Sequence, residues 1–260
     1  MNYPKPTKII IAEKENADVK TFLFEYPQEI IPGQFFMIWI PGVDEIPMSV
    51  SYIKKRGVRG ITFERVGDAT KALFELKEGD KIGIRGPYGN GFKISGKRIL
   101  FVGGGTGIAM IAPAVEEAIN KKISATVILG VKSKKELFFE NRLKKCGAEV
   151  HISTDDGSLG YKGLATELAK EIIAKEKFDL VLTCGPEMMM KKLYEICKNI
   201  PFQVSLERYM KCGIGICGQC CVDKGLRVCV EGPIFDGETL KSIEDFGVFK
   251  RDPSGKKVKF

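Results

Sequence analysis

Residues 207–232 read ERYMKCGIGICGQCCVDKGLRVCVEG and contain five of the eight cysteines of the 260-residue chain. Cys212, Cys217 and Cys220 follow the spacing C-x4-C-x2-C, and Cys229 comes after a short basic, hairpin-like interval. This spacing is typical of a plant-type [2Fe-2S] site, in which four thiolates hold two irons. The segment therefore predicts an iron–sulfur cluster with these four cysteines as its ligands.

The neighbouring residues fit the same interpretation. Gly213, Gly215 and Gly218 suit a tight loop around inorganic sulfide, which needs positive φ values and N–H groups free to point at sulfur. Cys221 would break the spacing if it replaced Cys220, so we interpret it as a neighbour. A structural zinc site is the main alternative, but zinc sites usually present two C-x2-C pairs and here there is one. A disulfide knot is disfavoured because we expect no secretory signal.

Composition limits the possible partners. The net charge of +8 is spread over lysine pairs with acidic residues between them, so no nucleic-acid partner is expected. The N-terminus has only a short apolar run, and we expect neither a signal peptide nor an anchor. The longest nearly apolar run, residues 99–115, holds four glycines and a proline and falls short of a membrane span. We expect a cytoplasmic protein that does not bind membranes.

The first third of the chain has the pattern of a β domain. Six short runs alternate with period two and are separated by turn residues: TKIIIAE, VKTFLFEY, QFFMIWI, MSVSYI, RGITFERV and KIGIRG. One short helical insert is predicted at residues 70–76. Six strands of this kind predict a small antiparallel Greek-key barrel.

Beyond residue 97 the pattern becomes one of alternating strands and helices. The strands are RILFVGG, ATVILGV, AEVHIST, FDLVLTC and FQVSL, with helices near residues 107–120, 135–145, 164–175 and 187–198. This alternation predicts a doubly wound parallel sheet whose ligand lies at the carboxyl ends of the strands. The fold class is thus β plus α/β multidomain. Its predicted domains are a barrel at 1–95, an α/β domain at 96–205 and a cysteine module with a loosely held polar tail at 206–260.

Two glycine turns of the α/β domain are candidate nucleotide sites. Residues 101–108, FVGGGTGI, join a strand to a helix through a turn that lets N–H groups and the helix dipole approach a pyrophosphate. Cys184, Gly185 and Pro186 form the second turn, directly before a helix with three methionines. The Cys184 side chain is either a cofactor contact or a buried core thiol.

A second anion site is predicted in the barrel. Residues 47–52, PMSVSY, end one strand run, and residues 67–70, GDAT, open the short helix. Hydroxyl groups and a helix N-terminus suit a phosphate, although Thr70 could instead cap its helix. Two anion sites and a metal cluster indicate a redox protein that binds two nucleotides.

These features together resemble the ferredoxin–NADP reductase superfamily. Within it, GDATKAL, GPYGNGF, TDDGSLG and ERYMKCGIG are most similar to the electron-transfer subunits of B-type dihydroorotate dehydrogenases, over residues 5–240. The resemblance implies hydride exchange between NAD(H) and FAD, then single-electron transfer through the [2Fe-2S] cluster. The electrons would pass to or from the FMN of a dihydroorotate dehydrogenase catalytic subunit, in a heterotetramer of pyrimidine biosynthesis.

The resemblance also implies where the cofactors bind. FAD is expected to border Pro47, Met48, Ser49, Glu64, Arg65, Val66, Ala69 and Thr70, with Thr70 on the pyrophosphate. NAD is expected to border Gly104, Gly105, Thr106, Asp155, Gly157, Ser158, Cys184, Gly185 and Pro186, and the cluster ligands are those deduced above. The family usually has an arginine before the Pro-x-Ser stretch, where this chain has Ile46. FAD binding would then be weaker or would depend on Arg65, Lys71 or another cation.

Two other functions stay open at the level of sequence. The flavin subunit of an NADPH-dependent ferredoxin or sulfide oxidoreductase shares the TDDGS and cluster motifs, and Lys132 and Lys134 could meet a 2′-phosphate. A non-catalytic nucleotide-sensing module held by zinc is the alternative from another class. No catalytic acid or base is expected within the chain, because electron transfer needs little proton chemistry from the protein. The single histidine, His151, lies in an apolar strand pattern and is interpreted as structural.

Overall fold

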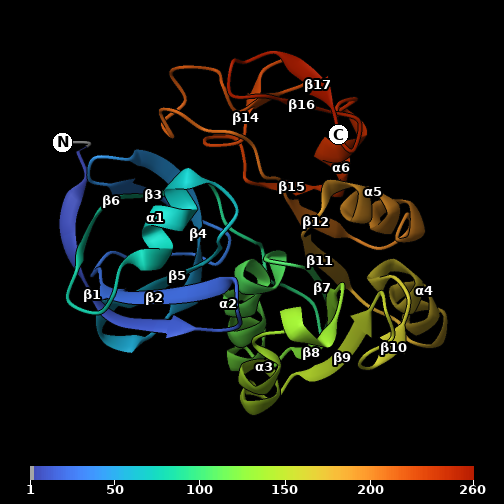
Figure 1. Ribbon diagram of the computed structural model, residues 1–260. Helices are drawn as coiled ribbons and strands as arrows, with labels where there is room; N and C mark the ends of the chain where they lie inside the picture. Colours follow the sequence, from blue (N-terminus) through green and yellow to red (C-terminus); the bar gives the residue numbers. More distant parts are fainter. Residues whose placement is uncertain (1–2) are drawn as a thin grey trace.

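A computed structural model describes residues 3–260 and begins with a closed barrel of six antiparallel strands (Figure 1). The strands are β1 (Lys5–Lys14), β2 (Val19–Glu25), β3 (Phe35–Ile40), β4 (Asp44–Ile53), β5 (Val58–Glu64) and β6 (Lys81–Tyr88). They close in the order β1-β2-β5-β4-β3-β6. All six coincide with the alternating runs of the sequence, which confirms the predicted barrel.

Strand β3 is buried on both faces at Phe35–Ile38, while Trp39 on its outward face is 39% exposed. Phe36, Ile38 and Ile40 belong to the core inside the barrel. Phe35 and Met37 point the other way and belong to a second core that they share with the C-terminal residues. Because successive side chains of a strand alternate between faces, the continuous apolar run FFMIWI marks a strand covered on both sides.

A single turn of 3-10 helix, η1 (Lys55–Gly57), precedes β5, and helix α1 (Asp68–Glu75) follows it. Helix α1 begins two residues before the predicted insert, because the Thr70 hydroxyl accepts the Gly67 N–H at 2.9 Å and caps the first turn. At the other end, the buried Lys20 ammonium donates to the carbonyls of Phe74 and Leu76 at 2.7 and 2.6 Å. Lys20 thus neutralises the negative end of the helix dipole.

The second half of the chain is built on a seven-stranded sheet of order β10-β9-β8-β7-β11-β12-β15. Its strands are β7 (Arg98–Gly104), β8 (Ser124–Val131), β9 (Glu149–Thr154), β10 (Tyr161–Lys162), β11 (Leu180–Cys184), β12 (Phe202–Ser205) and β15 (Ile234–Asp236). The strands from β10 to β12 are parallel, as predicted. The short strand β10 and the edge strand β15 are not apparent in the sequence pattern.

Helices cover both faces of this sheet (Figure 1). Helices α2 (Gly107–Asn120) and α3 (Glu140–Cys146) contribute to one core, and α4 (Ala165–Lys175) and α5 (Glu187–Ile196) contribute to the other. Helix α3 begins later than predicted, after the 3-10 turn η2 (Lys134–Glu136) and the left-handed residue Phe139. The doubly wound architecture expected from the alternation is therefore present.

The chain returns to the sheet after the cysteine-rich residues 207–232, here called the cysteine loop. Strand β15 pairs antiparallel with β12, so the cysteine segment supplies the last strand of the seven-stranded sheet. The remaining elements are the hairpin β13 (Cys221–Val222) with β14 (Leu226–Arg227), helix α6 (Gly237–Lys241), and the hairpin β16 (Phe249–Arg251) with β17 (Lys257–Lys259).

The prediction of a loosely held tail is wrong. Residues 249–259 form the β16–β17 hairpin, whose turn is closed by Asp252, because its carboxylate accepts the N–H groups of Ser254 and Lys256. Gln219 of the cysteine loop donates to the Asp252 carbonyl at 2.7 Å and attaches the hairpin to that loop. Within residues 3–260, no helix has the length and apolar character needed to cross a membrane.

Candidate redox site

Two glycine turns meet at the carboxyl edge of the parallel sheet. The turn after β7 and the turn after β11 are neighbours, since Gly103 pairs with Cys184 in register. A Cβ at Gly185 would lie 2.9 Å from the Gly104 Cα, and one at Gly107 would lie 2.3 Å from the Cys184 carbonyl oxygen. The two backbones touch here, so only glycine fits. By contrast, a Cβ at Gly105 would have no atom within 4 Å, so the space beside its Cα is open, while its N–H donates to the Gly130 carbonyl at 2.9 Å.

The third predicted nicotinamide segment lies at the same edge, farther along the sheet. Asp155, Gly157 and Ser158 follow β9, which is two strands away from β7 and hence about 10 Å from the glycine turn. The Ser158 hydroxyl accepts the Lys134 N–H at 2.8 Å, which joins this loop to the one after β8. The predicted NAD residues therefore form one edge whose length suits an extended dinucleotide.

The Cys184 side chain belongs to the protein core. It is 1% exposed and packs in the hydrophobic core to which α2 and α3 contribute. Burial raises the pKa of its thiol well above the usual value, against the lowering effect of a hydrogen bond with Ser205. The group is therefore a neutral core thiol, and only the main chain of Cys184 is available to border a cofactor.

The predicted flavin residues gather at one rim of the barrel. Pro47, Met48 and Ser49 are half-buried in β4, and α1 contacts both β3 and β4. The segment from Glu64 to Val66 is exposed beside the start of α1. Ile46 is half-buried and packs against the barrel core, so the position where the resemblance implies an arginine has an apolar contact here.

Arg65 and Lys71, the two cations that could replace the arginine expected at position 46, differ in how firmly other groups hold them. Arg65 forms an ion pair with Asp18 at 2.9 Å and lies over the Phe74 ring at 5.0 Å. Lys71, one residue after Thr70, is exposed, and its ion pair with Asp68 is longer, at 3.8 Å. Lys71 is therefore freer than Arg65 to approach an anion at the N-terminus of α1.

Thr70 serves as the cap of its helix. Its hydroxyl oxygen accepts the N–H groups of Val66 and Gly67 at 3.0 and 2.9 Å, and the hydroxyl donates to the Gly67 carbonyl at 3.1 Å. Thr70 therefore makes the hydrogen bonds of a helix cap, which is the alternative role that the sequence left open for it. These contacts also fix the N-terminus of α1 at the rim where the pyrophosphate was predicted.

Backbone N–H groups in the cysteine loop point at sulfur. Ile216 and Cys217 donate to the Cys212 sulfur at 3.4 Å each, and Gly215 donates to the Cys229 sulfur at 3.2 Å. The loop achieves this with Gly213, Gly215 and Gly218 at φ values of +69°, +81° and +69°. Burial opposes ionisation of Cys212, but the N–H donors outweigh it and lower its pKa to about 6. The N–H donors thereby favour the thiolate form of Cys212, which is the form of cysteine that binds metals.

The four cysteines interact with one another. The Cys212 thiol interacts with that of Cys217, and the Cys229 thiol interacts with those of Cys220 and Cys212. Among residues 3–260, no three histidine, cysteine or acidic side chains converge on one point as a single metal ion would require. Four neighbouring thiols are the donor set that a binuclear iron–sulfur cluster requires. Cys221 instead faces the Gly225 carbonyl, at 3.8 Å.

Asn90, which sequence reasoning did not single out, anchors the chain after Cys229. Its N–H donates to the Gly232 carbonyl at 2.7 Å, its amide donates to the Glu231 carbonyl at 2.7 Å, and its amide oxygen accepts the Ile234 N–H at 3.0 Å. The GPYGNGF segment of the barrel half therefore holds the cysteine loop. Its composition gives no sign of this role, because its partners lie more than 140 residues away.

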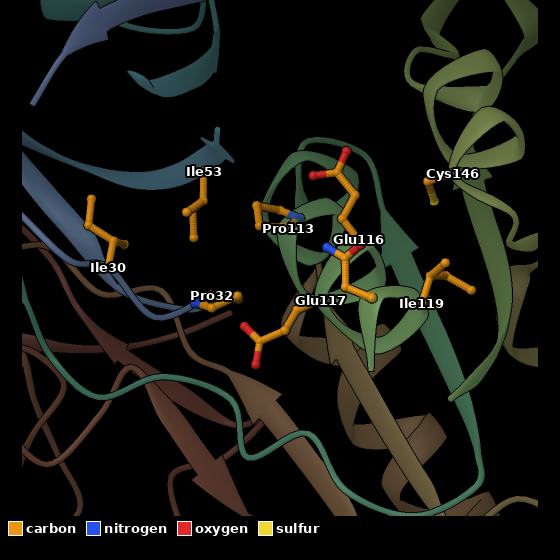
Figure 2. A pocket seen from close by; sticks show the side chains of 9 residues that line it. Ile30, Pro32, Ile53, Pro113, Glu116, Glu117, Ile119 and Cys146 are labelled. Carbon is orange, nitrogen blue, oxygen red and sulfur yellow. The ribbon is translucent and has the colours of Figure 1, made fainter. Parts of the chain in front are cut away.

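One groove between the two halves of the chain lies away from this site. A space of about 400 Å³ opens between Ile30, Pro32 and Ile53 of the barrel half and Pro113 and Glu117 of α2 (Figure 2). These α2 residues follow the glycine turn by about two helical turns. The groove is therefore separate from the carboxyl edge of the sheet.

Comparison with known proteins agrees with this geometry. The model of the iron–sulfur cluster binding domain of dihydroorotate dehydrogenase B matches residues 207–241, and the oxidoreductase NAD-binding domain matches residues 101–194. A protein of Methanocaldococcus jannaschii, named "Probable dihydroorotate dehydrogenase B (NAD(+)), electron transfer subunit", is 53% identical over 94% of both chains. The chain belongs to this family of electron-transfer subunits. A member from Methanothermobacter thermautotrophicus is 44% identical over 99% of this chain and 98% of that one.

Solved structures agree with the family and the fold. The NADH-dependent reduced ferredoxin–NADP oxidoreductase structure, described for flavin-based electron bifurcation, has a TM-score of 0.82 and 32% identity. The match covers 89% of this chain and 88% of the chain in that structure. The cytochrome P450 reductase GcoB of Amycolatopsis, with a TM-score of 0.67, 19% identity and coverage of 76% and 66%, shares the fold. The family confirms the prediction of an oxidoreductase component with FAD, NAD and a [2Fe-2S] cluster as cofactors.

Proposed function

We propose that this chain passes electrons between NAD(H), FAD and its [2Fe-2S] cluster to or from the FMN of a dihydroorotate dehydrogenase catalytic subunit. The reaction would serve pyrimidine biosynthesis in a cytoplasmic heterotetramer. Bound FAD would supply the exchange between the two electrons of a nicotinamide and the single electrons of a cluster. The observation that carries the proposal is the cysteine loop, which packs on the outer face of the barrel and then adds β15 to the nicotinamide-domain sheet.

The chain's own residues would bind and orient the cofactors. We assign NAD to the edge formed by the turns at Gly104–Thr106 and Cys184–Pro186 and by residues 155–158. The open space at Gly105 and the N-terminus of α2 suit a pyrophosphate there. We assign FAD to the rim formed by residues 47–49 and 64–66 and the start of α1, with Lys71 as the more exposed of the two candidate cations. The cluster would be held by Cys212 with Cys217 and by Cys220 with Cys229.

The proposed domain limits are 1–95, 96–205 and 206–260. The ends of β6 at Tyr88 and β12 at Ser205, and the start of β7 at Arg98, support these limits. Strand β15 is the exception, because it lies in the third segment and pairs with the second.

A partner subunit is supported by the surface around the cluster loop. Cys217 is exposed, and Ile214, Ile216 and Val230 beside it are 36%, 79% and 42% exposed. Exposed apolar side chains around a redox centre suit a protein interface.

The single histidine, His151, is 3.2 Å from Glu149 in an ion-pair arrangement within β9. We therefore assign the chemistry on the pyrimidine to the partner.

A second candidate is an NADPH-dependent ferredoxin oxidoreductase subunit. It is favoured by the 32% identity to the ferredoxin–NADP oxidoreductase structure and by the exposed Lys132 and Lys134 at the sheet edge. A 2′-phosphate would require these lysines. Stopped-flow reduction with NADH and with NADPH separates the candidates, because the proposed function expects NADH to be the faster donor.

The principal test is the visible spectrum of protein purified without oxygen, recorded before and after NADH is added. We expect flavin and iron–sulfur absorption, both of which bleach with NADH, and two irons and two sulfides per chain. Cys217→Ser should abolish the iron–sulfur absorption and leave the flavin bands. The matched variant Cys221→Ser should keep both. A colourless protein, or one that contains zinc and no iron, would refute the proposal.

A further inference from the structure

The cysteine loop lies directly on the barrel at one point. A Cβ at Gly213, next to Cys212, would lie 2.8 Å from the Cγ atom of Met37. Met37 points outward from β3 into the core that contains Cys220 and Cys229. In register, Met37 lies opposite Pro47 of β4 on one side and Arg85 of β6 on the other. The loop therefore covers the strand next to the proposed flavin rim.

Arg85 connects this face of the barrel to the first cysteine. Its Nε and Nη2 atoms donate to the two carboxylate oxygens of Glu45 at 2.6 Å each. Nη2 also donates to the Cys212 carbonyl at 2.9 Å, and Nη1 donates to the Tyr88 hydroxyl at 3.3 Å. The Arg85 side chain is 10% exposed and that of Glu45 is 22% exposed. The guanidinium is thus shielded from water and held by a bidentate partner.

The position of this pair links two cofactor sites. Glu45 belongs to β4, two residues before Pro47 and on the same face of the strand, because side chains alternate. Cys212 is the first proposed ligand of the cluster. Arg85 therefore connects the strand that we assign to the flavin with the main chain of a cluster ligand 127 residues away.

We propose that Arg85, oriented by Glu45, is a positioning residue that fixes the cysteine loop against the flavin barrel and raises the reduction potential of the cluster. Cluster potentials depend on nearby charge, hydrogen bonding and solvent exposure. A shielded positive charge stabilises the additional electron of the reduced cluster more strongly than an exposed one, because water screens it less. The inference rests on the proposed assignment of Cys212 and its three partners as ligands.

The test is a redox titration of the intact, cofactor-loaded protein, followed by the electron paramagnetic resonance signal of the reduced cluster. Arg85→Gln removes a positive charge and should lower the midpoint potential. Glu45→Gln removes a negative charge and should raise it. We expect the ratio of reduced to oxidised cluster at a fixed potential to change by about threefold or more, roughly 28 mV at 59 mV per tenfold.

Opposite shifts distinguish a charge effect from damage to the loop, which would move both variants in the same direction. Lys81→Gln is the matched control, because it removes the same charge from an exposed position of the same strand. It should leave the potential unchanged. Arg85→Lys keeps the charge and should stay closer to the wild-type potential than Arg85→Gln.

The experiment separates failure of the proposed role of Arg85 from failure of the ligand assignment. Full iron and sulfide with unchanged potentials, or with shifts of one sign in both variants, would overturn the role of Arg85 and leave the proposed function intact. A wild-type chain without iron and sulfide would overturn the ligand assignment itself. If Arg85→Gln fails to fold, Glu45→Gln alone decides the sign: a higher potential supports the role of Arg85, and an unchanged or lower one overturns it.

Discussion

Arg208 and Glu187 form a bidentate ion pair whose side chains are 2% and 4% exposed. Glu187 is the first residue of α5, directly after the Cys184–Pro186 turn, and Arg208 lies four residues before Cys212. The Glu187 carboxylate also accepts the Gly247 N–H at 2.8 Å. One buried pair therefore fastens the proposed nicotinamide turn to both ends of the cysteine module.

Loss of either partner of this pair should be strongly destabilising. Arg208→Leu would leave a buried carboxylate without its cation, at a cost of about 3–5 kcal/mol in the free energy of unfolding. Urea unfolding of the cofactor-loaded protein measures this cost. Glu238→Gln is the control, since it breaks the exposed Lys241–Glu238 pair and should cost less than about 1 kcal/mol. Equal effects of the two substitutions would contradict the structural role of the buried pair.

A side chain at Gly105 should weaken NADH binding, and its effect on stability should match that of a glycine with the same strain elsewhere. The Cβ would point into the open space at the β7 turn, and the positive φ of +53° adds strain of about 1–2 kcal/mol. We expect Gly105→Ala to raise the Kd for NADH at least about tenfold, or about 1.4 kcal/mol. Gly42→Ala has the same kind of strain, at φ +77° and in open space, far along the chain from the sheet edge. Similar NADH affinities in the two variants would refute the assignment.

Thr70 allows its two possible roles to be separated. Thr70→Val removes the hydroxyl that accepts the Val66 and Gly67 N–H groups and should destabilise the protein by about 1 kcal/mol. If the capped N-terminus also binds the FAD pyrophosphate, the variant should release FAD more readily, as seen in the flavin content after gel filtration. Thr70→Ser keeps the hydroxyl and should retain both stability and FAD. Loss of stability with full FAD retention would leave Thr70 only its capping role.

Tyr52 should make the protein less stable at alkaline pH. Burial raises the pKa of Tyr52 to about 12, against the lowering effect of the Arg142 guanidinium 3.6 Å from its ring. Because the folded state keeps the phenol neutral, its contribution is complete below the ordinary value of about 10 and is lost as the pH rises toward 12. Tyr52→Phe keeps the ring and removes the proton.

The measurement is the difference in free energy of unfolding between wild type and Tyr52→Phe at pH 8 and at pH 11. The wild type should lose more stability than the variant over this interval. Lysine deprotonation affects both proteins and cancels in the difference. Parallel pH profiles would show that Tyr52 ionises as freely in the folded protein as in the unfolded one.

Local signals predicted most of the secondary structure. The six barrel strands and five parallel strands follow from period-two alternation and short apolar runs, which depend only on residues near in sequence. The cysteine spacing and the glycine turns likewise carry their chemistry within a few residues. Boundaries shifted where side chains intervened, as at α1, whose start is determined by the Thr70 hydroxyl.

Long-range contacts were beyond this kind of reasoning. Strand β15 has only three residues and is defined by its pairing with β12, and the tail hairpin depends on the Asp252 turn and on Gln219. The roles of Arg85 and Asn90 depend on partners that are 127 and more than 140 residues away. A single sequence has no periodicity that reports such pairs.

The sequence by itself determined the kinds of elements and the chemistry available: a barrel, a doubly wound sheet and four cysteines spaced for two irons. Patterns of this sort arise from local geometry, because strand alternation and ligand spacing act over a few residues. Only the tertiary structure decided how the parts meet: Cys184 faces the core, Ile46 packs against the barrel core, and Arg85 contacts Cys212. These outcomes depend on burial and on charges brought together by folding, and both are properties of the packed chain.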